Sequence, residues 1–219
     1  IGLGIPAEPL FRSSIEAMLL KAMSEPDSAA YRMAYIYELD KAVTKEEARR
    51  ALDRIAARHE VLRTAVIYRN ISEPRQVILN RKPSVVMRDI RGSADPEKEI
   101  LKIREEVLQG EFDLENQHLF GLVVVRKTDE SCYIIMSVHH MIMDGWSLRP
   151  LVTDLSRFML EETSGEGIST ASDDRIMDGV YERSVRKTLL LDHRKGLEYF
   201  KKLLKDYDSP AEIPSFGEV

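Results

Sequence analysis

The sequence contains a single cysteine, Cys132, in 219 residues. One cysteine excludes an internal disulfide framework and a cluster of thiolate metal ligands. Because Ile134 and Ile135 follow it in an apolar segment, Cys132 is predicted to lie in the core. The scarcity of cysteine fits a reducing, cytoplasmic setting.

Long apolar segments are also missing. No run of eighteen apolar residues occurs, so no segment is predicted to span a membrane. The opening residues, IGLGIPAEPLF, lack the basic segment and apolar stretch of a secretory signal. The first residue is not methionine, which raises the alternative that the chain is excised from a longer protein.

Basic residues are not in excess. Lysine and arginine total 32 against 37 aspartates and glutamates, for a net charge of −5. One short basic cluster, at 186–187 and 193–195, is interleaved with leucines at helical spacing and is interpreted as the solvated face of a helix. A nucleic-acid partner, which needs a basic surface, is therefore not expected.

Hydrophobic periodicity predicts helices and strands in irregular alternation. Helices are expected at 13–23, 44–60, 95–109 and 148–160, with one helix or two over 176–206. Thr44 and Glu47 are expected to form a capping box at the start of the helix at 44–60, whose predicted core face is Ala48, Leu52, Ile55 and Ala56. Strands are expected at 30–39, 62–69, 76–79, 84–90, 119–126 and 132–138; those at 62–69 and 76–79 are expected to pair, and the two apolar strands at 119–126 and 132–138 to be buried on both faces. Small polar residues at 163–174 predict a loop or hinge. Strand pairs joined by short turns favour an α+β fold, a mixed α/β sandwich with helices flanking the sheet, over a doubly wound parallel sheet.

Residues 137–147 read SVHHMIMDGWS, and His139 and His140 are the strongest candidates for chemistry. They end an apolar strand, on which successive side chains point to opposite faces, so only one of them is expected to face a cleft. A zinc site needs three or four protein ligands. The other histidines, His59, His118 and His193, lack ligand-type spacing to the pair, so no metal site is predicted. A purely structural pair is an alternative.

General acid–base chemistry is the favoured interpretation of the pair, because the pKa of imidazole lies near neutrality. Such a histidine needs a fixed ring. Asp144 is placed to hold the ring directly, or to pair with an arginine and hold the loop. A buried carboxylate requires a partner, and Arg63, in the segment RHEVLRT at 58–64, is the favoured one.

HHMIMDGWS resembles the HHxxxDG motif of the condensation domains of nonribosomal peptide synthetases, which belong to the chloramphenicol-acetyltransferase-like acyltransferases. RHEVLRTAV resembles the family's RHExLRT segment. EFDLENQHLF resembles its FDL…PLF stretch, although His118 stands where proline is usual. The resemblance runs in order over about residues 10–215.

The chain departs from the family at two framework motifs. SSIEAMLL lacks the glutamine of the first family motif, and IMDGVY keeps Asp178 but lacks the aromatic residues around it. The order DGWS after the histidines, rather than the DGVSW of epimerisation domains, favours condensation.

The resemblance implies that 1–219 form one chloramphenicol-acetyltransferase-like lobe, the N-terminal lobe of a condensation domain, with 1–9 and 208–219 as extended tails. The implied partners are the missing C-terminal lobe, an adenylation domain, and donor and acceptor peptidyl carrier domains. The substrates are carried on the 4'-phosphopantetheine of the carriers, and no cofactor is expected to bind directly. No nucleic-acid or membrane partner is implied.

For the site, the resemblance implies that His140 faces a tunnel between the two lobes and acts on the acceptor α-amine, as a base or as a hydrogen-bond positioner. His139 is then structural, Asp144 is bridged to Arg63, and Gly145 keeps the backbone close to the substrate path. The isolated chain is predicted to fold but to be inactive, because the second lobe is missing.

Trp146 is interpreted as a core residue, with a place in the substrate tunnel, beside Ser147, as the alternative. Two other functions stay open. One is a free-standing acyltransferase that uses a coenzyme A thioester with the same His140 and Asp144. The other is a partial lobe that docks carrier domains without catalysis.

Overall fold

The structure, a computed structural model, describes residues 4–6, 9–25, 28–110, 113–116, 119–164, 180–189 and 194–207. Its helices are α1 (Pro9–Ser24), α2 (Lys45–Arg58), α3 (Pro96–Gln109), α4 (Gly145–Ser164), α5 (Val180–Leu189) and α6 (Arg194–Leu203), with a short 3-10 helix, η1, at Glu60–Arg63. Its strands are β1 (Gly4–Pro6), β2 (Arg32–Leu39), β3 (Thr64–Ile67), β4 (Arg75–Ile78), β5 (Val85–Asp89), β6 (Phe120–Arg126) and β7 (Cys132–His139). The predicted loop at 163–174 begins inside α4 and otherwise lies outside the described residues.

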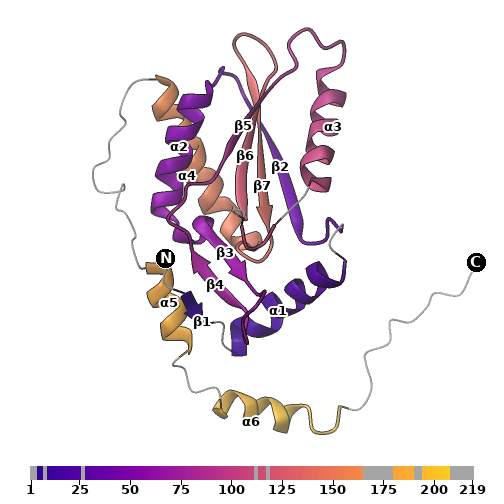
Figure 1. Cartoon of the computed structure of the whole chain (residues 1–219), viewed down its shortest axis with the longest axis vertical. Coiled ribbons are helices and arrows are strands. Elements are labelled where there is room, and N and C mark those ends of the chain that lie inside the picture. The colour runs from indigo at the N-terminus through magenta and orange to yellow at the C-terminus, as the bar shows by residue number, and fades with distance from the viewer. Residues whose placement is uncertain are drawn as a thin grey trace, which may run out of the picture.

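Four strands form the central sheet in the order β2–β7–β6–β5 (Figure 1). β7 pairs with β2 and with β6 in antiparallel fashion, whereas β5 pairs with β6 in parallel. A parallel pair needs a crossover connection, and α3 lies in the segment between β5 and β6. The sheet is therefore mixed and mostly antiparallel, which confirms the predicted fold class.

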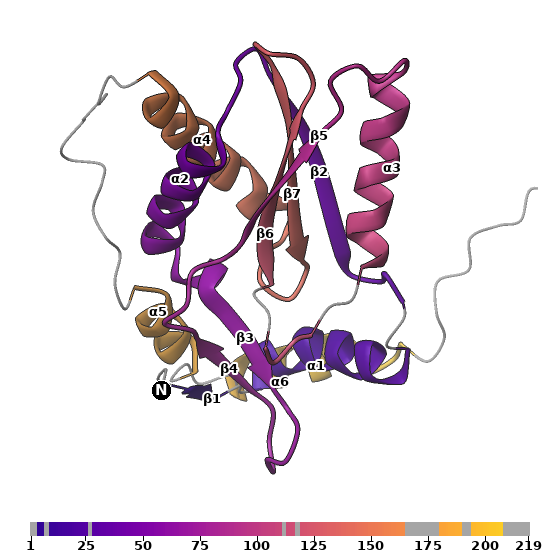
Figure 2. The same cartoon turned by 45° about the horizontal axis from the view of Figure 1, so that its top comes forward.

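Alternation along β6 sends neighbouring side chains to opposite faces of the sheet. Leu122 and Val124 belong to the larger apolar cluster, which includes α2 and α4, whereas Val123 and Val125 pack with Ile100 of α3. Figure 2 shows α2 and α4 on one side of the sheet and α3 on the other. Because helices cover both faces, β6 and β7 are buried along most of their length, as their apolar sequences predict.

α2 begins where its sequence predicts. Thr44 Oγ1 accepts a hydrogen bond from the backbone N–H of Glu47 at 3.2 Å, and the Glu47 carboxylate accepts one from the backbone N–H of Thr44 at 2.8 Å. This is the predicted capping box. The predicted core face is buried and consists of Ala48, Leu52, Ile55 and Ala56.

A smaller antiparallel sheet has the order β1–β4–β3. β3 and β4 form the predicted strand pair. The prediction of an extended tail over residues 1–9 needs correction, because Gly4–Pro6 pair with β4 as an edge strand and α1 begins at Pro9. The other predicted tail, 208–219, lies outside the described residues.

Candidate functional site

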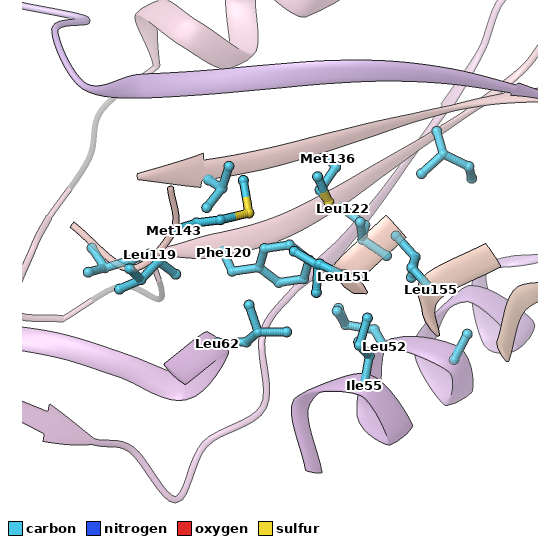
Figure 3. Packing of buried hydrophobic residues seen from close by; sticks show 14 of the residues in the cluster. Leu52, Ile55, Leu62, Leu119, Phe120, Leu122, Met136, Met143, Leu151 and Leu155 are labelled. Carbon is cyan, nitrogen blue, oxygen red and sulfur yellow. The ribbon is translucent and has the colours of Figure 1, made fainter. Parts of the chain in front are cut away.

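The two histidines lie where β7 ends and the chain turns into α4. His139 is the last residue of β7 and pairs with Arg32 of β2. The turn that follows is anchored by Met141, Ile142 and Met143, which are 4%, 7% and 5% exposed. Figure 3 shows Met143 among the buried side chains of the larger cluster. Close packing of these side chains fixes the turn between the histidines and α4.

His139 is held inside the protein in its neutral form. It is 2% exposed, and its Nδ1 accepts a hydrogen bond from the backbone N–H of Met141 at 3.2 Å. Burial, followed by the charges of Arg32 and His140, lowers the pKa of His139 to about 4. The neutral ring then carries its proton on Nε2. His139 is therefore not a base that titrates near neutral pH, and its contacts are those of a residue that positions the turn.

His140 faces a different cavity from His139. His139 lines a cavity of about 560 Å³ together with Arg32, whereas His140 lines one of about 440 Å³. The backbone N–H of His140 donates to the carbonyl of Tyr31 at 2.7 Å. Its ring Nδ1 is buried and has no hydrogen-bond partner among the described residues. The two histidines therefore line different cavities, although strand alternation predicts that only one of them faces a cleft. His140 keeps a ring nitrogen, Nδ1, that bonds to no described group.

Asp144 caps α4 and does not pair with Arg63. Its Oδ1 accepts hydrogen bonds from the backbone N–H and the hydroxyl of Ser147 at 2.8 and 2.6 Å, and these bonds lower the pKa of Asp144. Arg63 donates from Nε to the carbonyl of Ala56 at 3.0 Å and from Nη1 to that of Leu79 at 3.3 Å. The predicted ion pair is therefore wrong. Asp144 is exposed just before a helix, where N–H groups satisfy a carboxylate without a cation.

Gly145, Trp146 and Ser147 form the first turn of α4. A Cβ on Gly145 would meet no atom of the described residues within 4 Å, so open space lies beside its backbone in the part of the chain that the structure describes. Trp146 is 91% exposed, which contradicts its interpretation as a core residue. Ser147 lines the same cavity as His140 and Asp144. This turn therefore forms part of the surface next to the candidate histidine.

Glu60 and Tyr181 join the site although neither was identified from the sequence. The Glu60 carboxylate, 5% exposed, accepts a hydrogen bond from the backbone N–H of Tyr181 at 3.2 Å. The phenol of Tyr181 donates to Gln76 Oε1 at 2.9 Å, and burial raises the pKa of this phenol to about 12. Tyr181 lines the cavity of His140. The segment RHEVLRT contains Glu60, but its partner lies 121 residues further along the chain, a separation that no local pattern reveals.

Tyr31 is a third residue that sequence patterns missed. Its φ of 65° lies in the left-handed region, which costs a residue with a side chain roughly 1–2 kcal/mol. The hydrogen bond that its carbonyl accepts from the backbone of His140 ties this strained position directly to the candidate site.

The described residues contain no group of three or more His, Cys, Asp or Glu placed to hold a metal ion. Within them, no helix is both long and apolar enough to cross a bilayer. Cys132 is fully buried, as predicted, and burial raises the pKa of its thiol to about 11, so the thiol is protonated at neutral pH.

The fold and the site together define a class of protein. A mixed sheet, covered by helices on both faces, ends at a turn that presents one histidine to a mostly apolar cavity and buries the other. The chain is thus an α/β lobe whose candidate chemistry depends on a single imidazole.

The chain belongs to the Condensation domain family, which residues 13–209 match. This confirms the family that the motifs predict. The chain is similar to bacitracin synthase 1 of Bacillus licheniformis, with 28% identity over 206 residues that make up 92% of this chain and 4% of that protein. It is also similar to surfactin synthase subunit 2 of Bacillus subtilis (strain 168), with 27% identity over 202 residues, 91% of this chain and 6% of that protein.

Solved condensation domains share the fold. The starter condensation domain of rhizomide synthetase gives a TM-score of 0.77 at 17% identity, covering 90% of this chain and 48% of that chain. The first condensation domain of the CDA synthetase gives a TM-score of 0.66 at 17% identity, covering 96% and 49%. The chain therefore spans about half the length of these solved chains and a few per cent of the curated synthases.

Proposed function

We propose that this chain is the histidine-bearing lobe of a condensation domain that forms a peptide bond between two carrier-bound substrates. The acceptor α-amine attacks the carbonyl carbon of the donor thioester. The C–N bond forms, the C–S bond breaks, and the donor phosphopantetheine leaves as a thiol that takes up the proton lost by the amine. Family membership supports the reaction type. The site assignment is carried by the position of His140 in the lining of a cavity, with a ring Nδ1 that bonds to no described group.

His140 is the catalytic residue of this proposal. An attacking amine must be neutral, and an α-amine with a pKa of about 8 is partly neutral near physiological pH. His140 either takes the proton of the amine or holds the amine by a hydrogen bond, and both roles need an unoccupied ring nitrogen. His139 supports it by tying the turn to the core, and Asp144 supports it by starting α4.

The neighbouring residues have smaller roles in the proposal. The open side of Gly145 leaves room for a substrate close to the backbone. Ser147 contributes to the cavity wall, and the exposed Trp146 lies at the edge of the substrate path. Arg63 acts at a distance, by joining η1 to carbonyls of α2 and of the residue after β4.

The proposed partners are a C-terminal lobe, an adenylation domain, and the donor and acceptor carrier domains whose 4'-phosphopantetheine arms hold the substrates. No cofactor binds the chain directly. The isolated chain is inactive in this proposal, because the facing wall of the substrate tunnel belongs to the other lobe. The short coverage of solved condensation domains supports this view.

The test replaces His140 with alanine in the synthetase that carries the chain and measures, by mass spectrometry, the dipeptide formed on the acceptor carrier. Loss of a general base costs about 10²–10⁴-fold in rate, and a fall in that range is expected. His59→Gln is the matched control, because His59 pairs with Asp154 on α4, away from the cavity lining. Unchanged product with His140→Ala contradicts the proposal. Ready product formation by the isolated chain contradicts its inactivity.

A further inference from the structure

The cavity beside His140 is lined mainly by apolar side chains. They come from α1, from η1 and from the turn after β7: Ile15, Met18, Val61, Met141, Ile142 and Met143. Its volume of about 440 Å³ lies within the range of about 300–1,000 Å³ that is usual for small-molecule sites. Met18 of α1 is only partly buried, and its unbranched side chain can adapt to apolar groups of different shapes.

The polar groups of this cavity disfavour an anionic ligand. Among the described residues that line it there is no lysine or arginine, and Asp144 is the only carboxylate. Both hydrogen bonds that Asp144 accepts come from Ser147. A carboxylate brought into the cavity would therefore approach a negative charge without meeting a cation.

Tyr181 forms a fixed part of the cavity wall. Its backbone N–H is held by Glu60, and its hydroxyl is held by Gln76, which in turn donates to Thr64 Oγ1 at 3.2 Å. Because the hydroxyl donates its only proton to Gln76, it has no proton left to donate to a ligand, and the aromatic ring is the apolar part of Tyr181 that can contact one. The wall is thus rigid and apolar on the side contributed by α5.

We propose that this cavity binds an aliphatic group of the thioester substrate, and that Tyr181 limits the length of the group it admits. The chemical class follows from the apolar lining, from the volume and from the lack of a lysine or arginine among the described lining residues. The proposal rests on the proposed function only in taking the ligand to be a thioester substrate.

Binding is tested on the 219-residue chain with two thioesters of N-acetylcysteamine, hexanoyl and glutaryl. The readout is the ring NMR signal of His140 in histidine-labelled protein, assigned with His140→Asn. Hexanoyl thioester should shift this signal saturably, and the anionic glutaryl thioester should bind at least about tenfold more weakly. Equal affinity for the two thioesters, or no saturable shift with hexanoyl, overturns the proposal.

Two pairs of variants locate the ligand. Met18→Gln should weaken hexanoyl binding by about tenfold or more, whereas Leu20→Gln should not, because Leu20 lies on the same helix but is 65% exposed and outside the lining. Tyr181→Ala should admit a decanoyl thioester that the unchanged chain and Tyr181→Phe bind poorly. If Met18→Gln and Leu20→Gln behave alike, or if Tyr181→Ala gains no affinity for decanoyl thioester, the cavity is not this site.

Failure of the cavity proposal and failure of the proposed function are distinguishable. Thioester binding by the chain does not require turnover, whereas the effect of His140→Ala on product formation does. Selective hexanoyl binding with unchanged product in His140→Ala supports the cavity and overturns the catalytic assignment. If His140→Ala loses product but the chain does not bind hexanoyl thioester selectively, the catalytic assignment is supported and the cavity proposal is overturned.

Discussion

The carboxylate of Asp144 accepts two hydrogen bonds from Ser147, one from its backbone N–H at 2.8 Å and one from its hydroxyl at 2.6 Å. A side chain that precedes a helix and accepts from the third helical N–H acts as an N-cap. The aspartate of HHMIMDGWS therefore stabilises the start of α4, directly after the turn that carries His140. It affects the candidate base through the backbone rather than through an ion pair.

Replacing Asp144 should therefore weaken the fold modestly. Asp144→Ala is expected to lower the free energy of unfolding by about 1 kcal/mol, because the first turn of α4 loses its cap. Asp144→Asn should lose less, since its amide oxygen still accepts a hydrogen bond. Urea unfolding followed by circular dichroism measures both. Full stability of Asp144→Ala would show that the cap contributes nothing.

A double-mutant cycle distinguishes the cap from the ion pair predicted from the sequence. Asp144→Ala and Arg63→Ala should be additive within about 0.5 kcal/mol, because the two residues share no partner among the described residues. Arg54 and Glu161, whose side chains pair at 2.5 Å between α2 and α4, provide the positive control. A coupling energy between Asp144 and Arg63 as large as that of the control pair would instead support the predicted ion pair.

Local patterns in the sequence predicted most of the fold. The capping box of Thr44 and Glu47 needs residues only three apart, and the two-sided burial of β6 follows from its continuous apolar run. That His139 and His140 line different cavities agrees with strand alternation, although both of them line one. Each of these features is decided by residues that are near one another in the chain.

The failures have a common physical origin. The predicted pairing of Asp144 with Arg63 assumes that the carboxylate is buried, and the interpretation of Trp146 as a core residue assumes that its side chain is buried. Both lie on the solvent side of the first turn of α4. Which side of a helix end faces water depends on the sheet and helices around it, and the link from Glu60 to Tyr181 depends on α5 packing there.

Protonation of His139 should make the stability of the chain depend on pH. Its pKa falls from 6.5 to about 4 on folding, so between these values the unfolded chain binds a proton that the folded chain does not. Stability is therefore lost as pH falls from 6.5 towards 4, by about 3 kcal/mol from this group, and below pH 4 the loss levels off. His139→Gln should lack this component. Parallel pH profiles for the two proteins would contradict a buried neutral His139.

Gly145→Ala separates the effect of the site on folding from its effect on substrate access. A Cβ at this position meets no protein atom within 4 Å, and alanine favours a helix over glycine by up to about 1 kcal/mol. Unfolding should therefore be unchanged or shifted to higher denaturant. Peptide-bond formation in the synthetase should nevertheless fall if a substrate passes beside this backbone. Unchanged product formation would remove Gly145 from the substrate path.

Trp146 is the only tryptophan, so its fluorescence reports on the first turn of α4 alone. At 91% exposure, the indole should emit as it does in water and should be quenched freely by acrylamide. Trp146→Ala should change the free energy of unfolding by less than about 0.5 kcal/mol. Replacing a buried tryptophan with alanine would instead lower that free energy by about 3–5 kcal/mol. A partner that covers this turn should shift the emission to shorter wavelength and protect it from acrylamide. If loaded carrier domains leave the emission unchanged, Trp146 does not line the path that their substrates take.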